Sequence, residues 1–174
     1  MKNLFKIMLG IWVLTGVQYQ AFSQNVETDP VSKEAISSLQ HLIGSWSGSG
    51  WMMGADRERY EFTQTEHIQF KLDSTAILIE GQGKTHDQII HNAMAIVTFG
   101  GEKDQYSFQS YLQNGRKGEF KAETINGNFY WYPREDIRYI IRIDEQETWF
   151  EIGEIKKGEN WYQFFEMTLS KNAQ

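Results

Sequence analysis

Residues 44–51 have the sequence GSWSGSGW, and this segment opens a run of alternating, aromatic-rich residues that continues almost to the C-terminus. Glycine at alternate positions lets a strand bend sharply, because no side chain obstructs the curvature. Trp46 lies at the start of the run, where its large ring can plug one end of a curved sheet. We therefore expect a small closed antiparallel barrel, which either fills its interior or holds one small ligand there.

The first 23 residues have the pattern of an export signal. Lys2 and Lys6 precede an apolar stretch at residues 7–17 that is too short to span a bilayer. Small residues at positions 21 and 23 predict cleavage after Ser23 and a periplasmic or secreted protein. The alternatives for this segment are an N-terminal membrane anchor and a buried helix. No later apolar run reaches spanning length, so no membrane span is expected after removal of the signal.

The rest of the chain is predicted to form one domain. We expect a flexible N-terminus at residues 24–30, the barrel at residues 31–171 and a short tail at residues 172–174. The chain contains no cysteine, so burial of its apolar and aromatic side chains must stabilise the fold without disulfides. Its formal net charge of −6 disfavours binding to a nucleic-acid backbone. The sequence leaves the oligomeric state open.

A single helix is predicted before the strands. Asp29 and Pro30 are typical of a helix start, and apolar residues at helical spacing continue to Ile43, just before Gly44. This pattern predicts an amphipathic helix of about three turns that packs across one end of the sheet.

From Ser45 onward the apolar pattern has a period of two, which predicts about ten short strands in meander order. Asn114-Gly115 and Asn126-Gly127 are strong hairpin signals, and the connection at residues 83–90 could include a short helical turn. An all-β, closed up-and-down barrel leaves no unpaired edge strand, whereas the alternative, a β-sandwich, does. We therefore predict the closed barrel.

The helical segment followed by Gly44-x-Trp46 resembles the opening of the lipocalin and calycin families, in which the tryptophan closes the barrel floor. The longer pattern Gly-x-Trp-x-Gly-x-Gly at residues 44–50 is similar to nitrobindin-like barrels, and residues 149–154 and 161–169 resemble secreted bacterial lipocalin-like proteins of uncharacterised function. The resemblance covers about residues 39–171. Nitrobindin-like proteins bind haem through a histidine on the late strands, and residues 161–170 contain none, so no haem or other cofactor is expected.

The four histidines give no strong metal signal. His86 and His91, with Asp87 between them, are close enough in sequence to share a metal ion, but a solvated polar loop explains them better. His67 falls on the polar face of its strand, and His41 lies near the end of the predicted helix, where a surface or capping role is expected. No metal site is predicted.

Polar residues at inward-facing positions are the candidates for a ligand site. Gln64 and Glu66 share a strand face with apolar residues, so regular pleating directs both into the barrel. A buried glutamate needs a partner, and Arg138, Arg142 or a tyrosine hydroxyl is the expected one; the alternative is a solvated outer face or a purely structural pair. The predicted ligand-binding residues are Tyr60, Phe62, Gln64, Glu66, Tyr106, Phe108, Trp131, Arg138, Arg142 and Glu166.

The leading functional hypothesis is an exported lipocalin-like barrel that binds or carries a small, mainly apolar molecule in its interior. Standard catalytic signatures, such as a Gly-x-Ser-x-Gly elbow or a cysteine nucleophile, do not occur. One alternative is a small-molecule enzyme of the isomerase or hydratase type, which would use the inward carboxylate of Glu66. Another is an envelope protein-interaction domain that presents exposed aromatic residues.

Overall fold

The computed structural model describes residues 26–173, and ten antiparallel strands form one closed barrel. Each strand pairs with its neighbours in sequence, and β1 also pairs with β10, which closes the barrel. The strands are β1 (Gly44–Met53), β2 (Arg59–Lys71), β3 (Ala76–Thr85), β4 (Gln88–Phe99), β5 (Gln105–Leu112), β6 (Lys117–Ile125), β7 (Asn128–Arg134), β8 (Ile137–Ile143), β9 (Thr148–Lys157) and β10 (Asn160–Lys171). The predicted up-and-down barrel is thus confirmed, and the sandwich alternative is wrong. The export-signal prediction concerns residues 1–23, which lie outside the described part of the chain.

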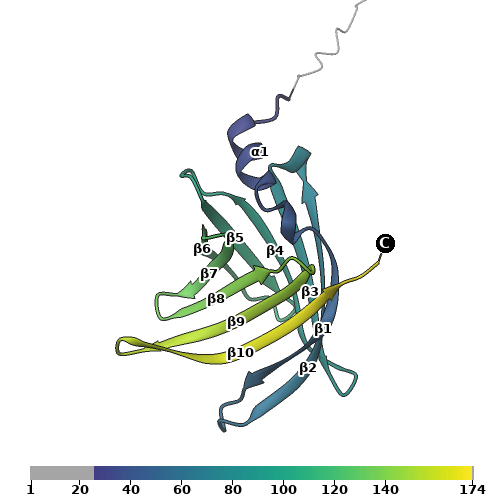
Figure 1. The fold of residues 1–174 in the computed structure, drawn as a ribbon, viewed down its shortest axis with the longest axis vertical. Helices are drawn as coiled ribbons and strands as arrows, with labels where there is room; N and C mark the ends of the chain where they lie inside the picture. The colour runs from purple at the N-terminus through teal and green to yellow at the C-terminus, as the bar shows by residue number, and fades with distance from the viewer. Residues whose placement is uncertain (1–25, 174) are drawn as a thin grey trace, which may run out of the picture.

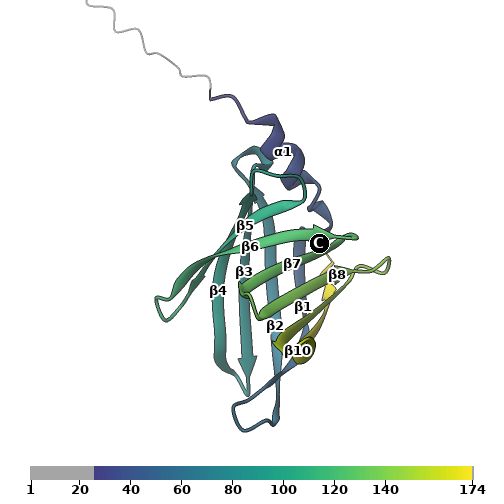
Figure 2. The same cartoon turned by 90° about the vertical axis from the view of Figure 1, so that its left-hand side faces the viewer.

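The strands run in two main directions around the barrel. In Figure 2 the long strands β2, β3 and β4 run along the molecule, whereas β6, β7 and β8 cross them at a large angle. The helix α1 (Pro30–Ser37) lies at one end, and the β1–β2 and β3–β4 hairpins project at the other (Figure 1). We call the end beside α1 the closed end and the opposite end the open end. Within residues 26–173, no helix is long and apolar enough to cross a membrane.

The helix is shorter than the sequence pattern predicts. The Asp29 side chain accepts a hydrogen bond from the Ser32 backbone N–H, which caps the start as expected. The helix nevertheless ends at Ser37, and a separate 3₁₀ turn follows at Gln40–Leu42. The Ser38 hydroxyl donates to the Ala35 carbonyl at 2.6 Å, and such side-chain bonds compete with continued helix formation. The apolar spacing persists across both segments because both pack on the closed end.

The connection between β3 and β4 is also tighter than expected. Both strands extend until only His86 and Asp87 lie between them, and both residues have positive φ, at 45° and 64°. Two consecutive residues with positive φ form the type of two-residue turn that suits a twisted hairpin. The predicted helical turn at residues 83–90 is therefore wrong.

The closed end is sealed by Trp46, which is fully buried. Its indole N–H donates to the Leu42 carbonyl at 3.0 Å, and its ring meets Trp149 edge-on, with 5.6 Å between ring centroids. The seam between β1 and β10 is very tight at Gly48, where a Cβ atom would lie 2.1 Å from the Thr168 carbonyl oxygen. Glycine at this position thus lets the first and last strands approach closely.

Candidate functional site

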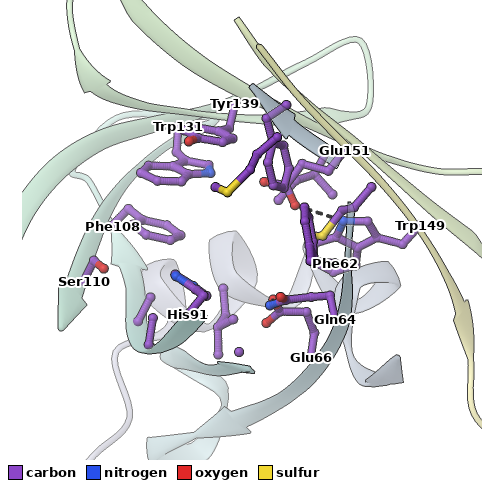
Figure 3. Close-up of a pocket in the computed structure, with 18 of the residues that line it drawn as sticks. Phe62, Gln64, Glu66, His91, Phe108, Ser110, Trp131, Tyr139, Trp149 and Glu151 are labelled. Carbon is purple, nitrogen blue, oxygen red and sulfur yellow. Dashed lines mark hydrogen bonds between the residues drawn. The ribbon is translucent and has the colours of Figure 1, made fainter. Parts of the chain in front are cut away.

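The barrel interior contains a cavity of about 240 Å³. Its lining includes Trp149, which contacts Trp46 at the closed end, and Met52 and Ile90, which belong to the hairpins of the open end. Figure 3 shows Trp149 on the cavity wall beside Phe62 and Glu151. An engineered apolar cavity of about 150 Å³ binds benzene, so this volume suits a molecule of one or two rings. The barrel is therefore not completely filled by its own side chains.

Five aromatic rings form a continuous arc along the cavity wall. Phe108 stacks on Trp131 at 4.6 Å between centroids, and Trp131 stacks on Tyr139 at 4.5 Å. Tyr139 meets Phe165 edge-on at 5.5 Å, and Phe165 stacks on Phe62 at 5.6 Å. These contacts link β5, β7, β8, β10 and β2, so the arc covers more than half of the barrel circumference. We call these five residues the aromatic arc.

The remaining wall, formed by β3 and β4, carries small side chains. Gly81, Ala93 and Ala95 line the cavity there, with Ile79 beside them. A Cβ atom at Gly81 would lie 2.6 Å from a carboxyl oxygen of Glu66, and one at Gly83 would lie 2.6 Å from the amide oxygen of Gln64. The two glycines on β3 therefore make room for polar side chains from β2. The small residues of β3 and β4 therefore leave space in the cavity beside Gln64 and Glu66.

Glu66 is one of two acidic side chains inside the cavity. It is 9% exposed, and its Oε1 atom accepts a hydrogen bond of 2.6 Å from the Gln64 side-chain amide. Burial raises the pKa of Glu66 to about 7, although the Gln64 amide opposes this shift. Figure 3 shows Gln64 and Glu66 side by side, across the cavity from Trp131 and Tyr139.

Glu151 on β9 is the second acid and is 6% exposed. Its Oε2 atom accepts a hydrogen bond of 3.1 Å from the Trp149 indole. Burial raises the pKa of Glu151 to about 8; the charge of Glu66 adds to this effect, while the indole groups of Trp149 and Trp131 oppose it. Near neutral pH the two carboxyl groups therefore retain protons that ordinary glutamates lose.

Five of the ten predicted ligand-binding residues line the cavity. Gln64 and Glu66 point inward as their strand position predicts, and apolar neighbours surround them. The five are Phe62, Gln64, Glu66, Phe108 and Trp131.

The predicted arginine partners lie outside the barrel. Arg138 forms an ion pair of 2.7 Å with Glu154 and stacks on Trp161, and Arg142 lies over the ring of Phe150. Tyr139 and Ile141 between them face the cavity instead. The prediction that an arginine balances an inward glutamate is thus wrong, because the adjacent face of β8 is the one that turns inward.

Three other predicted residues also lie away from the cavity. Tyr60 is half exposed near the open end and donates to Asp56, and Tyr106 is buried at the closed end, with its hydroxyl 3.0 Å from that of Ser38. Glu166 lies on the outer side of β10, where it accepts a hydrogen bond from Gln163. An irregularity between Gln163 and Phe165 shifts the register of this strand against β9.

The histidines are separated by the fold. His86 is in the β3–β4 turn and His67 bonds with Ser45 on the outer surface, whereas His91 lines the cavity near the open end. Burial lowers the pKa of His91 and favours its neutral form. Across residues 26–173, no group of three or more histidine, cysteine or acidic side chains is arranged to hold a metal ion.

Glu151, Tyr139 and the role of Gly81 are not among the features predicted from the sequence. Glu151 is two residues after the buried Trp149, so strand alternation alone places both on one face. Tyr139 was obscured because β8 has isoleucine on both faces. For Gly81 no signal was available, since its function depends on the carboxyl group of a neighbouring strand.

The open end carries several exposed apolar side chains. Met52, Tyr60, Ile89 and Ile90 are each 40–51% exposed, and they belong to the β1–β2 and β3–β4 hairpins that project there (Figure 1). Met52 and Ile90 also line the cavity. An apolar rim is thus continuous with the interior and gives apolar molecules a path into it.

Together, the closed ten-stranded barrel, its tryptophan floor and its interior cavity give the chain a lipocalin-like barrel fold. No protein family and no curated protein matches the chain in sequence. The chain is similar in structure to Rv2717c from M. tuberculosis, with a TM-score of 0.63, 12% identity, and coverage of 84% of this chain and 100% of the other. It is also similar to the S-type phycobiliprotein lyase CPES from Guillardia theta, with a TM-score of 0.55, 10% identity, and coverage of 85% and 99%. At these identities the similarity concerns the fold.

Proposed function

We propose that this protein binds one small, mainly apolar aromatic molecule inside its barrel. The observation that carries the proposal is the cavity of about 240 Å³ between the aromatic arc and the small residues of β3 and β4. Aromatic walls bind flat apolar molecules through stacking and burial of apolar surface. The similarity in fold to the phycobiliprotein lyase CPES supports this proposal, because the two chains share the barrel architecture.

The cavity offers few polar groups, so they would fix the orientation of the ligand. Gln64, Glu66 and Glu151 lie on its inner wall, and Ser110 and His91 add polar atoms on β5 and β4. A small number of polar groups within an apolar pocket is typical of ligand sites that bind one molecule in one orientation.

Filling the cavity is expected to abolish binding. Ala95 is buried and lines the cavity, so Ala95→Phe places a ring in the space that the ligand needs. Isothermal titration calorimetry with 2-phenylethanol should show binding to the natural protein and at least about tenfold weaker binding to the variant, a difference of about 1.4 kcal/mol. Circular dichroism checks that the barrel has folded.

The matched control is Met94→Phe, which adds a ring at the adjacent, outward-facing position on β4. This variant should bind 2-phenylethanol like the natural protein. Equal binding by folded Ala95→Phe, or no binding by the natural protein, would contradict the proposal.

A second candidate is an enzyme that moves a proton on the bound molecule. This candidate is favoured by Glu66, whose carboxyl group points into the apolar cavity. Burial raises the pKa of Glu66 to about 7. Such a group can exchange a proton with a substrate near neutral pH. Incubation of the protein with the molecule that co-purifies with it distinguishes the two functions: an enzyme converts it, and Glu66→Gln stops conversion, whereas a carrier returns it unchanged.

We also propose that the barrel is exported. The support is the sequence of residues 1–23, with two lysines before an apolar stretch and a small-residue cleavage pattern. N-terminal sequencing of the protein from its native cells should begin at Gln24. A retained Met1 would exclude processing at this position.

A further inference from the structure

The two acids in the cavity have no positively charged partner among residues 26–173. Glu66 and Glu151 both line the cavity, whereas Arg138 and Arg142 lie on the outside of the barrel. The lining contains no lysine or arginine at all. Natural proteins rarely bury carboxyl groups without a cation, because removing the charge from water is costly. A cation supplied by the ligand would complete the arrangement.

The side chains around the two acids are arranged to donate to them. Gln64 donates to Oε1 of Glu66, and Trp149 donates to Oε2 of Glu151. Glu66 Oε2 accepts no hydrogen bond from a side chain within residues 26–173, whereas the indole groups of Trp149 and Trp131 both act on Glu151. Hydrogen bonds from N–H donors favour carboxylates over carboxylic acids, so the neighbours of both groups prepare them as acceptors.

The aromatic arc provides a second kind of attraction for a cation. Trp131, Tyr139 and Phe62 line the same cavity as the acids, with both faces of Trp131 covered by Phe108 and Tyr139 and one face of Phe62 covered by Phe165. Ring faces attract ammonium groups, most strongly where water is excluded. The net charge of −6 also favours the approach of cations over that of anions.

We propose that the ligand is an arylalkylamine, whose ring packs against the aromatic arc and whose ammonium group binds to Glu66 and Glu151. This inference rests on the proposed binding function and specifies the chemistry of the ligand. A neutral ligand with a carbonyl group is the competing possibility, because it would accept a proton from either carboxylic acid. The two differ in the sign of their pH dependence.

Three molecules with a common ring separate these possibilities. They are 2-phenylethylamine, which is cationic, 2-phenylethanol, which is neutral, and 3-phenylpropanoate, which is anionic. We expect 2-phenylethylamine to bind at least tenfold more tightly than 2-phenylethanol at pH 8 by isothermal titration calorimetry. Its affinity should fall at pH 6, because Glu66 and Glu151 must release protons to accept it. His91 and Tyr139 are the other titratable groups of the cavity, and both are neutral at pH 8.

The double variant Glu66→Gln/Glu151→Gln should lose the preference for the amine, so that 2-phenylethylamine binds no more tightly than 2-phenylethanol. Glu80→Gln is the matched control, since Glu80 lies on the outer face of neighbouring β3 and should leave the preference unchanged. Equal or tighter binding of 2-phenylethanol at pH 8, or an amine preference that survives in the folded double variant, would overturn the inference and leave the binding function intact. If none of the three molecules binds, both proposals fail.

Discussion

Replacing Trp46 with alanine is expected to lower the free energy of unfolding by about 3–5 kcal/mol, the range for loss of a large buried aromatic side chain. Trp46 is fully buried at the closed end of the barrel. Its ring contacts Trp149 and lies beneath the Lys171 ammonium group, 5.3 Å from the ring centroid. Alanine would leave a void between the first strand, the last strand and the helical segment, and these elements cannot all collapse into it.

The indole nitrogen contributes separately from the ring. It donates to the Leu42 carbonyl, which ends the 3₁₀ turn, so Trp46→Phe keeps most of the apolar contact but leaves this buried acceptor without its donor. The cost of such an unsatisfied group is about 1–3 kcal/mol. Trp46→Phe should therefore be intermediate between the natural protein and Trp46→Ala.

Urea denaturation followed by circular dichroism measures these differences. Trp51→Ala is the control, because Trp51 lies on the same strand, is partly exposed and mainly contacts Arg59. Its loss should cost about 1 kcal/mol or less, the range for an exposed cation–π contact. If Trp46→Ala and Trp51→Ala had equal effects, Trp46 would not be the floor of the barrel.

The fold was accessible from the sequence because each of its signals is local. Alternation along the strands, asparagine–glycine turns and the glycines at residues 44–50 each predict a nearby conformation, and together they favour closure. The length of α1 was not accessible in this way. It depends on the Ser38 hydroxyl, which bonds with the Ala35 carbonyl instead of leaving the helix to continue.

The sequence predicted the candidate site only in part. Alternation along a strand shows which face a residue lies on, but not its position along the barrel axis. Tyr60, Phe62 and Tyr106 all occupy apolar strand faces, yet Tyr60 lies near the open end and Tyr106 at the closed end, so only Phe62 meets the cavity. Arg138 shows the second limit. Because β8 has isoleucine on both faces, its apolar pattern does not show which face turns inward. Arg138 lies on the outer face, where it contacts Glu154 of β9 and Trp161 of β10.

The stability of the barrel is expected to fall as the pH rises from about 5 to 8. In the folded protein burial holds the pKa of Glu66 at about 7 and that of Glu151 at about 8, compared with 4.5 for an ordinary glutamate. Between pH 4.5 and about pH 8 the folded state binds more protons than the unfolded state, so the free energy of unfolding decreases as the pH rises. Each retained proton contributes a slope of about 1.4 kcal/mol per pH unit. Above about pH 8 the slope should disappear.

Other titratable side chains change the free energy of unfolding in the opposite direction or in a different pH range. Burial lowers the pKa of His41 and His91, so these two residues make stability rise with pH until their unfolded forms lose their protons near 6.5. Hydrogen bonds lower the pKa of Asp29, Asp56 and Asp73. Their contributions to stability are therefore lost only in more acidic solution. The acidic pair is therefore best isolated as a difference between variants.

Glu66→Gln/Glu151→Gln removes both ionisations while keeping the size of the side chains. Thermal unfolding should show that the melting temperature of this variant, relative to the natural protein, increases steadily from pH 5 to pH 8, by roughly 2–4 °C for each kcal/mol in a domain of about 150 residues. The contributions of His41 and His91 cancel in this comparison, because both proteins contain them. Glu80→Gln, which alters an exposed carboxyl group on β3, should run parallel to the natural protein throughout. Parallel curves for the double variant as well would mean that Glu66 and Glu151 are already ionised at pH 5, and that solvent reaches the cavity floor freely.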